Sequence, residues 1–282
     1  FNILNKNNKK IASFYLDPYS RPESKRGGAW MDECLNKNNI GRNTLPVAYL
    51  VCNQTPPSKD KPSLMSFDEV QTLFHEFGHG LQHMLTTVNL PQAAGINNVE
   101  WDAVELPSQF MENWCFHKNT LLNIAKHYKT GERLSDENFE KLVKNRTFNC
   151  GMATLRQLHF AITDIRLHSN IYSNKGKHSD EIRKEIASNT TVIPPIQEDK
   201  FLCCFSHIFA GGYSAGYYSY KWAEVLSADA FSMFEEADLE NNQNIKAIGK
   251  KFKDTILSLG GSYSPLEVFK LFRGREPKTD SL

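Results

Sequence analysis

Three residues within one short segment, His75, Glu76 and His79, have the types and spacing that could hold and use a metal ion. Residues four positions apart on an α-helix lie one turn apart and about 40° around its axis, so both imidazoles can bind one ion. Glu76 lies about 100° from His75, close enough to contact a water at that ion without binding the metal. The pattern therefore indicates zinc-assisted hydrolysis. The alternative is a solvated helix face that carries two histidines and no ion.

A catalytic zinc ion needs a third protein ligand and keeps one position open. His83 does not suit this role, because it lies about 12 Å along the helix axis from His75. The segment that follows the helix offers three carboxylates, Glu100, Glu105 and Glu112, and their spacing does not choose among them. Each could instead be a surface carboxylate.

A second segment, residues 205–220, combines three glycines, one histidine and four tyrosines. Tyr213, Tyr217 and Tyr220 would share one face of a helix. An aromatic stripe of this kind often packs in a core. Here the adjacent glycines favour a flexible loop, and phenol groups can donate hydrogen bonds to an oxyanion. The segment is a candidate substrate loop.

The helix that must carry the two histidines has a clear start signal. Ser66-Phe-Asp-Glu69 is a capping box. Apolar residues follow at three- and four-residue spacing, which predicts a helix over 67–86 with the histidines opposite its apolar stripe. Similar periodicity predicts helices over 106–128, 135–146, 150–172, 178–188, 216–240 and 243–258.

The first 62 residues are predicted to form strands and loops. Lys10–Leu16 alternates and is expected to stop at Asp17-Pro18, and Leu45–Cys52 is a short apolar run. Between them, 25–28 and 37–39 are predicted loops. The fold class is therefore mainly α with a small β-sheet. A shallow division near residue 63 has no long linker, so we expect one catalytic domain over 1–282, with strands and loops in 1–62 and the metal site in 63–282.

Composition excludes several classes of protein. The 282 residues are 40% hydrophobic and 23% charged, with a net charge of +1, so the basic excess of a nucleic-acid-binding protein is missing. No apolar run approaches the length of a membrane span. Six scattered cysteines without a CxxC pair favour a reducing, cytoplasmic compartment. The chain starts at Phe1 rather than Met, and we expect it to be part of a longer protein.

Five segments together resemble the thimet oligopeptidase family of zinc metallopeptidases. They are residues 25–31, 74–80, 101–114, 205–220 and 272–277. The resemblance runs over nearly the whole chain, and so is more specific than the histidine motif. It implies a zincin-type catalytic domain of the thimet oligopeptidase and neurolysin-like fold. It also implies that a missing N-terminal half forms the other wall of a deep channel that admits short unfolded peptides.

The resemblance also assigns roles at the metal site. It implies one Zn²⁺ per chain bound by His75, His79 and Glu105, with Glu76 activating water. Asp102 matches an acid near the third ligand and is expected to orient a zinc-bound histidine. The family commonly has a histidine at the position of Gln82, a side chain that is not a ligand.

In the glycine–tyrosine segment, Tyr213 and Tyr220 match tyrosines that contact the substrate and the oxyanion. The neighbouring candidates are His207 as a further catalytic residue, and Tyr217, Gly211 and Gly212 in substrate binding.

The function expected from the resemblance is hydrolysis of internal bonds in short peptides during cytoplasmic peptide degradation, with no nucleic-acid or membrane partner. An extended peptide could pair with an exposed edge strand beside the helix. Two alternatives stay open. One is a peptidyl-dipeptidase of the same family, and the other is a non-catalytic remnant that binds peptides.

Overall fold

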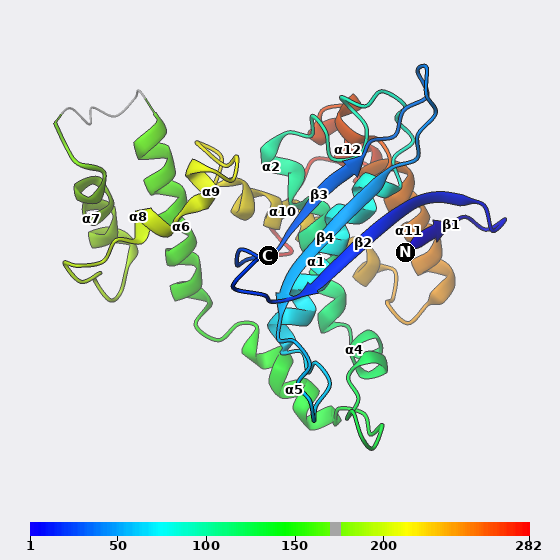
Figure 1. Ribbon diagram of the computed structural model, residues 1–282, viewed down its shortest axis with the longest axis horizontal. Helices are drawn as coiled ribbons and strands as arrows, with labels where there is room; N and C mark the ends of the chain where they lie inside the picture. The colour runs from blue at the N-terminus through cyan, green and yellow to red at the C-terminus, as the bar shows by residue number, and fades with distance from the viewer. Residues whose placement is uncertain (170–175) are drawn as a thin grey trace. The chain divides into compact units, whose positions relative to one another are not determined.

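The computed structural model describes residues 1–169 and 176–282 (Figure 1). The chain divides into two compact units. The first unit contains residues 1–134 and 223–282, and the second contains residues 135–222. The expected single catalytic domain stays a prediction.

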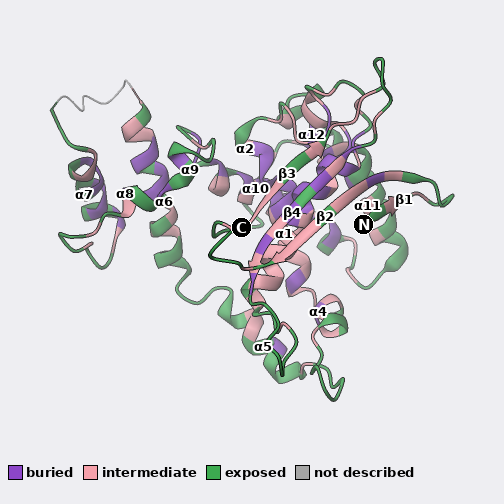
Figure 2. Cartoon of the chain, in the orientation of Figure 1, coloured by how far each residue is buried: buried purple, intermediate pink, exposed green. Residues whose placement is uncertain are grey.

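A four-stranded sheet begins the first unit. Its strands are β1 (Asn2–Leu4), β2 (Lys10–Tyr19), β3 (Trp30–Leu35) and β4 (Val47–Gln54), in the spatial order β1-β2-β4-β3. β2 and β4 pair in parallel, and the other two pairs are antiparallel. β4 alternates buried and more exposed residues along its length (Figure 2), as expected for a strand with one face on a core.

The sequence predicts β2 and β4, but its predicted stop at Asp17-Pro18 is wrong. β2 continues to Tyr19, and its register with β4 shifts between Asp17 and Tyr19. Pro18 has no N–H to give to a ladder, and it is tolerated at this irregularity. The edge strand β3 lies between the two predicted loops and was not predicted.

Helix α1 (Phe67–Met84) packs against the sheet and carries the histidine motif (Figure 1). Its predicted capping box is present: Ser66 Oγ accepts the N–H of Glu69 at 3.2 Å, and Glu69 Oε2 accepts that of Ser66 at 2.7 Å. Apolar side chains of α1, among them Phe77 and Met84, pack with Ala12 and Ala48 of the strands. The predicted helix over 67–86 is confirmed to within two residues.

The region 106–128 is not one helix. It contains α3 (Leu106–Asn113), the short 3₁₀ turn η1 (Trp114–Phe116) and α4 (Lys118–Ile124), and α2 (Trp101–Val104) precedes them. His117 has an extended backbone, with φ −78° and ψ 121°, and this ends the helical run.

The C-terminal part of the first unit supplies most of its apolar core. Its elements are α10 (Ser219–Glu236, which starts in residues of the second unit), α11 (Asn242–Phe252), the π-helical turn η2 (Lys253–Leu257), the 3₁₀ turn η3 (Gly260–Ser262) and α12 (Pro265–Arg273). Phe110 of α3 packs between rings from α10 and α11, with centroids 5.6 Å from Phe231 and 4.0 Å from Phe252. The sequence did not predict α12.

The second unit is helical. It contains α5 (Asp136–Asn145), α6 (Cys150–His168), α7 (Ser179–Thr190), α8 (Phe201–Cys204) and α9 (Ser206–Phe209). The predicted helices over 135–146, 150–172 and 178–188 correspond to α5, α6 and α7. Residues 170–172 of that prediction lie outside the described residues. Phe160, Phe205, Ile208 and Tyr217 contribute to its buried cluster.

The predicted fold class, mainly α with a small β-sheet, is confirmed. In the described parts of the chain, no helix has both the length and the apolar character needed to cross a membrane.

Candidate metal centre

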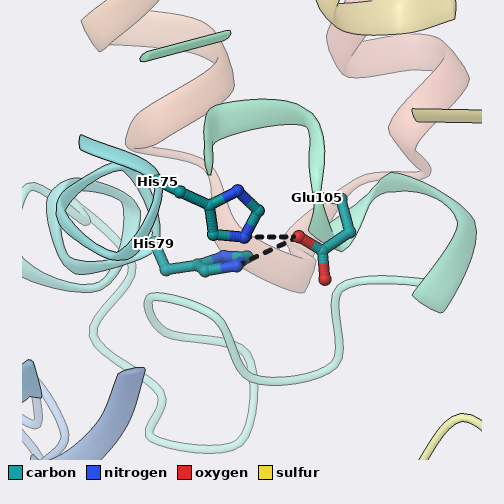
Figure 3. Close-up of side chains that lie close together, drawn as sticks. All are labelled: His75, His79 and Glu105. Atoms are coloured by element: carbon teal, nitrogen blue, oxygen red, sulfur yellow. Dashed lines mark ion pairs between the residues drawn. The ribbon is translucent and has the colours of Figure 1, made fainter. Parts of the chain in front are cut away.

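The structure brings His75, His79 and Glu105 together (Figure 3). Glu105 Oε2 lies 3.1 Å from His75 Nε2 and 3.2 Å from His79 Nε2. One donor atom from each residue lies within 4.8 Å of the others. Two imidazoles and one carboxylate are a donor set typical of catalytic zinc, so the residues present fit such an ion.

Glu105 owes its position to a break between two helices. It ends α2 and precedes α3, and its side chain is 1% exposed. Ser108 Oγ lies 2.9 Å from Glu105 Oε2 and 2.9 Å from the Glu105 carbonyl oxygen. Its hydroxyl can donate to either of them and so ties the carboxylate to the first turn of α3.

Gly78, inside the histidine motif, lets α1 and α3 approach each other closely. A Cβ atom at Gly78 would lie 2.4 Å from the carbonyl oxygen of Pro107 and 2.6 Å from Cα of Ser108. Both are backbone atoms, so a side chain here would push away the segment that holds Glu105. Gly78 lies between the histidines in the sequence, but the close approach that requires a glycine there is visible only in the structure.

Glu112 contacts the other nitrogen of the His75 ring. Its Oε1 lies 2.6 Å from His75 Nδ1, and its Oε2 accepts a hydrogen bond from Gln71 Nε2 at 2.9 Å. A carboxylate in this position fixes the orientation of a metal-binding imidazole. The sequence offered Glu112 as a possible ligand and missed this role. The seven-residue spacing from Glu105, two helical turns, was the available signal.

The two remaining acidic candidates have other positions. Glu100 is exposed and precedes α2, outside the three-residue group. Asp102 is half-buried in the first turn of α2. Nδ1 of His75 is engaged by Glu112, and Nδ1 of His79 is buried with no hydrogen-bond partner among the described residues. The expected orienting role of Asp102 therefore stays a prediction.

Glu76 is buried beside the histidines. It is 5% exposed, and its Oε2 finds no hydrogen-bond partner in the described parts of the chain. Burial raises the pKa of this carboxyl, and the nearby His75 and His79 offset only part of that effect. A raised pKa suits a carboxylate that must accept a proton near neutral pH.

The charges of the cluster depend on one another. Burial opposes protonation of His75, but Glu105 and Glu112 outweigh it and raise the pKa of His75 well above its usual value. Burial likewise favours the neutral acid at Glu105, yet His79 and His75 hold its pKa well below the usual range. The site thus favours the deprotonated carboxylate at Glu105, the form that a metal ligand needs.

Two further residues of α1, His83 and Gln82, are buried and lie outside the three-residue group. His83 is fully buried, and its Nε2 lies 3.0 Å from the carbonyl oxygen of Leu35, which agrees with its exclusion as a ligand. Gln82 is 4% exposed, and its Oε1 lacks a hydrogen-bond partner among the residues described.

The tyrosine candidates gather within the second unit. The rings of Tyr213 and Tyr220 stack at 4.9 Å, and His207 lies 6.2 Å from each of them. Tyr217 is buried, and its hydroxyl donates to Gln157 Oε1 at 3.1 Å. This contact favours a packing role for Tyr217, and its predicted substrate contact stays a prediction.

The two adjacent glycines are required by the backbone. A Cβ atom at Gly211 would lie 2.8 Å from Cα of His207, and Gly212 has a left-handed φ of +87°. Their predicted part in substrate binding remains untested.

An HExxH helix whose histidines meet a glutamate from a later segment is the arrangement of zincin-type metallopeptidases. The sequence of residues 1–282 matches that of peptidase family M3, and the chain belongs to this family. The resemblance expected from the five segments is thus confirmed.

Individual relatives agree with this membership. Organellar oligopeptidase A of Arabidopsis thaliana is 56% identical over 287 residues, covering 100% of this chain and 36% of that protein. A probable cytosolic oligopeptidase A of the same plant is 58% identical over 276 residues, with 96% and 39% covered. The chain therefore spans less than two fifths of the length of these curated relatives.

Among solved structures, PZ peptidase A with inhibitor 2 has a TM-score of 0.59 and 15% identity. The match covers 91% of this chain and 39% of that one. This likeness supports the predicted zincin-type fold.

Proposed function

We propose that this protein is a zinc-dependent oligopeptidase that hydrolyses internal bonds of short, unfolded peptides. One observation carries the proposal: the donor atoms of His75, His79 and Glu105 converge, and Glu76 is buried on the same helix. The relatives named oligopeptidase A support short peptides as the class of substrate.

One Zn²⁺ would be held by His75, His79 and Glu105. When bound, zinc supplies a Lewis acid and lowers the pKa of water to about 7. Glu112 orients the His75 ring through Nδ1, and Ser108 holds the carboxylate of Glu105. These contacts keep the ligands in place before any ion arrives, which reduces the cost of ordering the site on binding.

Glu76 is the general base of the proposed reaction. It takes a proton from the attacking water and passes it to the amine nitrogen of the leaving peptide. Burial raises the pKa of this carboxyl, which favours the first transfer. Tyr220 and Tyr213 are proposed to donate hydrogen bonds to the oxyanion, with His207 nearby and Gly211 and Gly212 allowing the loop to fit the substrate.

The peptide backbone is proposed to bind by strand addition. β3 is the last strand in the sheet order and pairs with β4 on one side, so its other edge can accept an extended chain. Recognition of backbone rather than side chains predicts weak sequence selectivity. A strong preference for one side chain that survives changes in β3 would contradict this mode.

The domain organisation, the channel, the cellular location and the partners of the protein are also proposals. We propose one catalytic domain over 1–282 and a channel whose other wall comes from a preceding segment. A cytoplasmic location stays a prediction, since the relatives include both organellar and cytosolic proteins. We propose no nucleic-acid or membrane partner.

The test of zinc binding is native mass spectrometry of the parent and Glu105→Ala. We expect one zinc ion in the parent and a weakened or empty site in the variant. Glu100→Ala is the matched control, because Glu100 is exposed and lies outside the cluster. A parent that takes up no zinc when zinc is supplied would overturn the metal assignment.

Activity is then measured on a peptide blocked at both ends. An endopeptidase cuts it, whereas a peptidyl-dipeptidase requires the free carboxyl end. Glu76→Gln should keep zinc and lose turnover, and normal turnover would remove Glu76 as the base. Zinc binding with no cleavage of any peptide by the full-length protein would favour the peptide-binding remnant.

A further inference from the structure

Asp164 of α6 is a fully buried carboxylate in the second unit. Its Oδ1 accepts the N–H of Ala215 at 2.9 Å, and its Oδ2 accepts the N–H of Tyr217 at 2.9 Å. His168 Nδ1 lies 2.8 Å from Oδ1 and 3.0 Å from the carbonyl oxygen of Asp164. A buried carboxylate is costly unless its oxygens are satisfied. Here the satisfying donors are two backbone amides of one loop and one imidazole.

That loop comprises residues 210–218. It adopts a backbone that needs support, because Ala215 has a left-handed φ of +56°. Side chains with a Cβ rarely adopt this region. The hydrogen bond from the Ala215 N–H to Asp164 holds this strained residue directly. A second tie runs from Ser214 Oγ to the carbonyl oxygen of Ile208 at 2.5 Å.

Helix α6 holds Tyr217 at two points. Asp164 accepts from its backbone N–H, and Gln157, two turns earlier on the same helix, accepts from its hydroxyl. The Tyr217 ring lies 5.0 Å from that of Tyr220, which in turn stacks on Tyr213 at 4.9 Å. The placement of these two outer rings is therefore coupled to α6 through packed aromatic contacts.

We propose that Asp164 is a positioning residue for substrate conversion. By fixing Ala215 and Tyr217, it sets the orientation in which Tyr213 and Tyr220 present their hydroxyls. The proposal rests on the function proposed above for those two tyrosines. Asp164 is buried and acts through the loop backbone, without touching the substrate.

The chemistry requires a carboxylate at this position. Both oxygens accept a backbone N–H, and one also faces the His168 ring. The amide of Asp164→Asn has nearly the same shape but offers one oxygen and one NH₂ group. One of the two loop amides would then face a donor, and the loop would shift or loosen.

The first measurement is steady-state kinetics of Asp164→Asn in the zinc-loaded, full-length protein. We expect kcat to fall by about ten- to a hundredfold, as misplaced catalytic groups do, with zinc content unchanged. The matched control is Thr163→Val, a fully buried neighbour whose hydroxyl donates within α6 to the carbonyl oxygen of His159 at 2.6 Å. We expect its kcat to equal that of the parent. Normal kcat in Asp164→Asn would overturn the proposal.

A double-mutant cycle with Tyr220→Phe tests whether Asp164 acts through the tyrosines. We expect Asp164→Asn to add little further loss when Tyr220 has already lost its hydroxyl. Additive losses would show that Asp164 serves only general stability and would overturn the inference. A Tyr220→Phe variant with unchanged kcat would instead overturn the proposed tyrosine role itself, and the inference with it.

Hydrogen exchange gives a readout that needs no activity. The amides of Ala215 and Tyr217 should exchange faster in Asp164→Asn and not in Thr163→Val, while protection of α1 stays unchanged. Unchanged exchange at both amides would contradict the proposal. If Asp164→Asn does not fold, Gln157→Leu provides a milder change on the half-buried part of α6. It should lower kcat to a smaller extent and show the same non-additivity with Tyr220→Phe, and full additivity would again overturn the inference.

Discussion

Glu105 and Glu112 contact opposite nitrogens of one imidazole. Oε2 of Glu105 lies 3.1 Å from Nε2 of His75, and Oε1 of Glu112 lies 2.6 Å from Nδ1. The histidine is thus clamped from both sides by carboxylates two helical turns apart in sequence. The side toward His79 is the one where a metal would sit, so Glu105 is placed to be a ligand and Glu112 to orient the ring.

The role of Glu112 gives a prediction at the residue scale. Glu112→Gln keeps the size of the side chain and removes the charge that holds Nδ1. We expect zinc affinity to fall by about 10- to 100-fold, the usual effect of losing such a partner. Competition with a chelator of known affinity measures it, with Glu100→Gln as the control. Equal affinity in both variants would mean that Glu112 has no orienting role.

Gly78 gives a second prediction. In Gly78→Ala the new methyl group would meet the backbone of Pro107 and Ser108, which cannot move without shifting Glu105. We expect less than one zinc per chain and a loss of about 1–3 kcal/mol in unfolding free energy. Gly249→Ala in α11 is the control, since nothing lies within 4 Å of its Cβ position. That variant should be neutral or up to about 1 kcal/mol more stable.

Sequence reasoning reached the metal site only in part. The histidine spacing identified the helix face, because periodicity alone decides which side chains share a turn. The spacing did not decide which of three carboxylates is the third ligand. That choice depends on the break between α2 and α3 at Glu105, which spacing does not show. The resemblance supplied Glu105. Side-chain packing decides which nitrogen of His75 Glu112 contacts, and no pattern in the sequence predicts that contact.

At the scale of elements, one buried carboxylate joins the end of α12 to α10. Asp229 is fully buried and accepts hydrogen bonds from Arg273 Nε at 2.9 Å, from both terminal nitrogens of Arg275 at 2.5 and 2.6 Å, and from the N–H of Lys278 at 2.7 Å. Gly274, with a φ of +78°, ends α12 and turns the chain so that both arginines reach the same acid. Arg273 also pairs with Glu236.

The hydrogen bonds of Asp229 with Arg273 and Arg275 predict that the free energy of unfolding depends on pH. Burial favours the neutral acid, but hydrogen bonds from Arg275 and Arg273 outweigh it and lower the pKa of Asp229. Its contribution is therefore fully present above the unfolded pKa of about 3.9, and it is lost as pH falls through the lower folded value.

We expect Asp229→Asn to destabilise the fold by about 3 kcal/mol at neutral pH, as in other broken buried pairs, and by progressively less below about pH 4. Denaturant unfolding at several pH values measures this. Glu236→Gln, at an exposed partner of Arg273, should cost no more than about 1 kcal/mol. A pH-independent deficit in Asp229→Asn would contradict the mechanism.

Elements with strong local signals were predictable from sequence. The capping box and apolar spacing predict α1, and the same capping signal, Ser264-Pro-Leu-Glu267, marks the start of α12. β3 is different: its residues are intermediate or exposed with no regular alternation, so only pairing with β4 makes it a strand. The extended backbone of His117, which ends the helical run after η1, likewise has no local signal in the sequence.

At the scale of the whole molecule, the proposed ion should stabilise the folded chain. A ligand that binds only the native state adds about 2.7 kcal/mol when its free concentration is 100 times its Kd. We expect the thermal unfolding midpoint to rise with zinc and to fall when a chelator is added. Glu105→Ala should show neither shift. A rise of the same size in that variant would mean that zinc acts elsewhere on the chain.

The division into units was beyond the reach of the sequence. The sequence has no long linker near residue 63, and in the structure Ala48 of the strands and Phe77 of α1 share one cluster. The first unit joins residues 1–134 with 223–282. No local sequence pattern predicts that these two stretches belong to one unit. Such information lies in long-range packing, here the aromatic contacts of Phe110 with α10 and α11.

The split first unit has a consequence for the order of events during synthesis. The second unit is one continuous stretch of sequence. In the first unit, Phe110 can make its native contacts only after Phe231 and Phe252 have been synthesised. At about 5–20 residues per second, that delay is on the order of ten seconds. Throughout it, the apolar side of α3 lacks the cover that α10 and α11 provide and offers a target for chaperones.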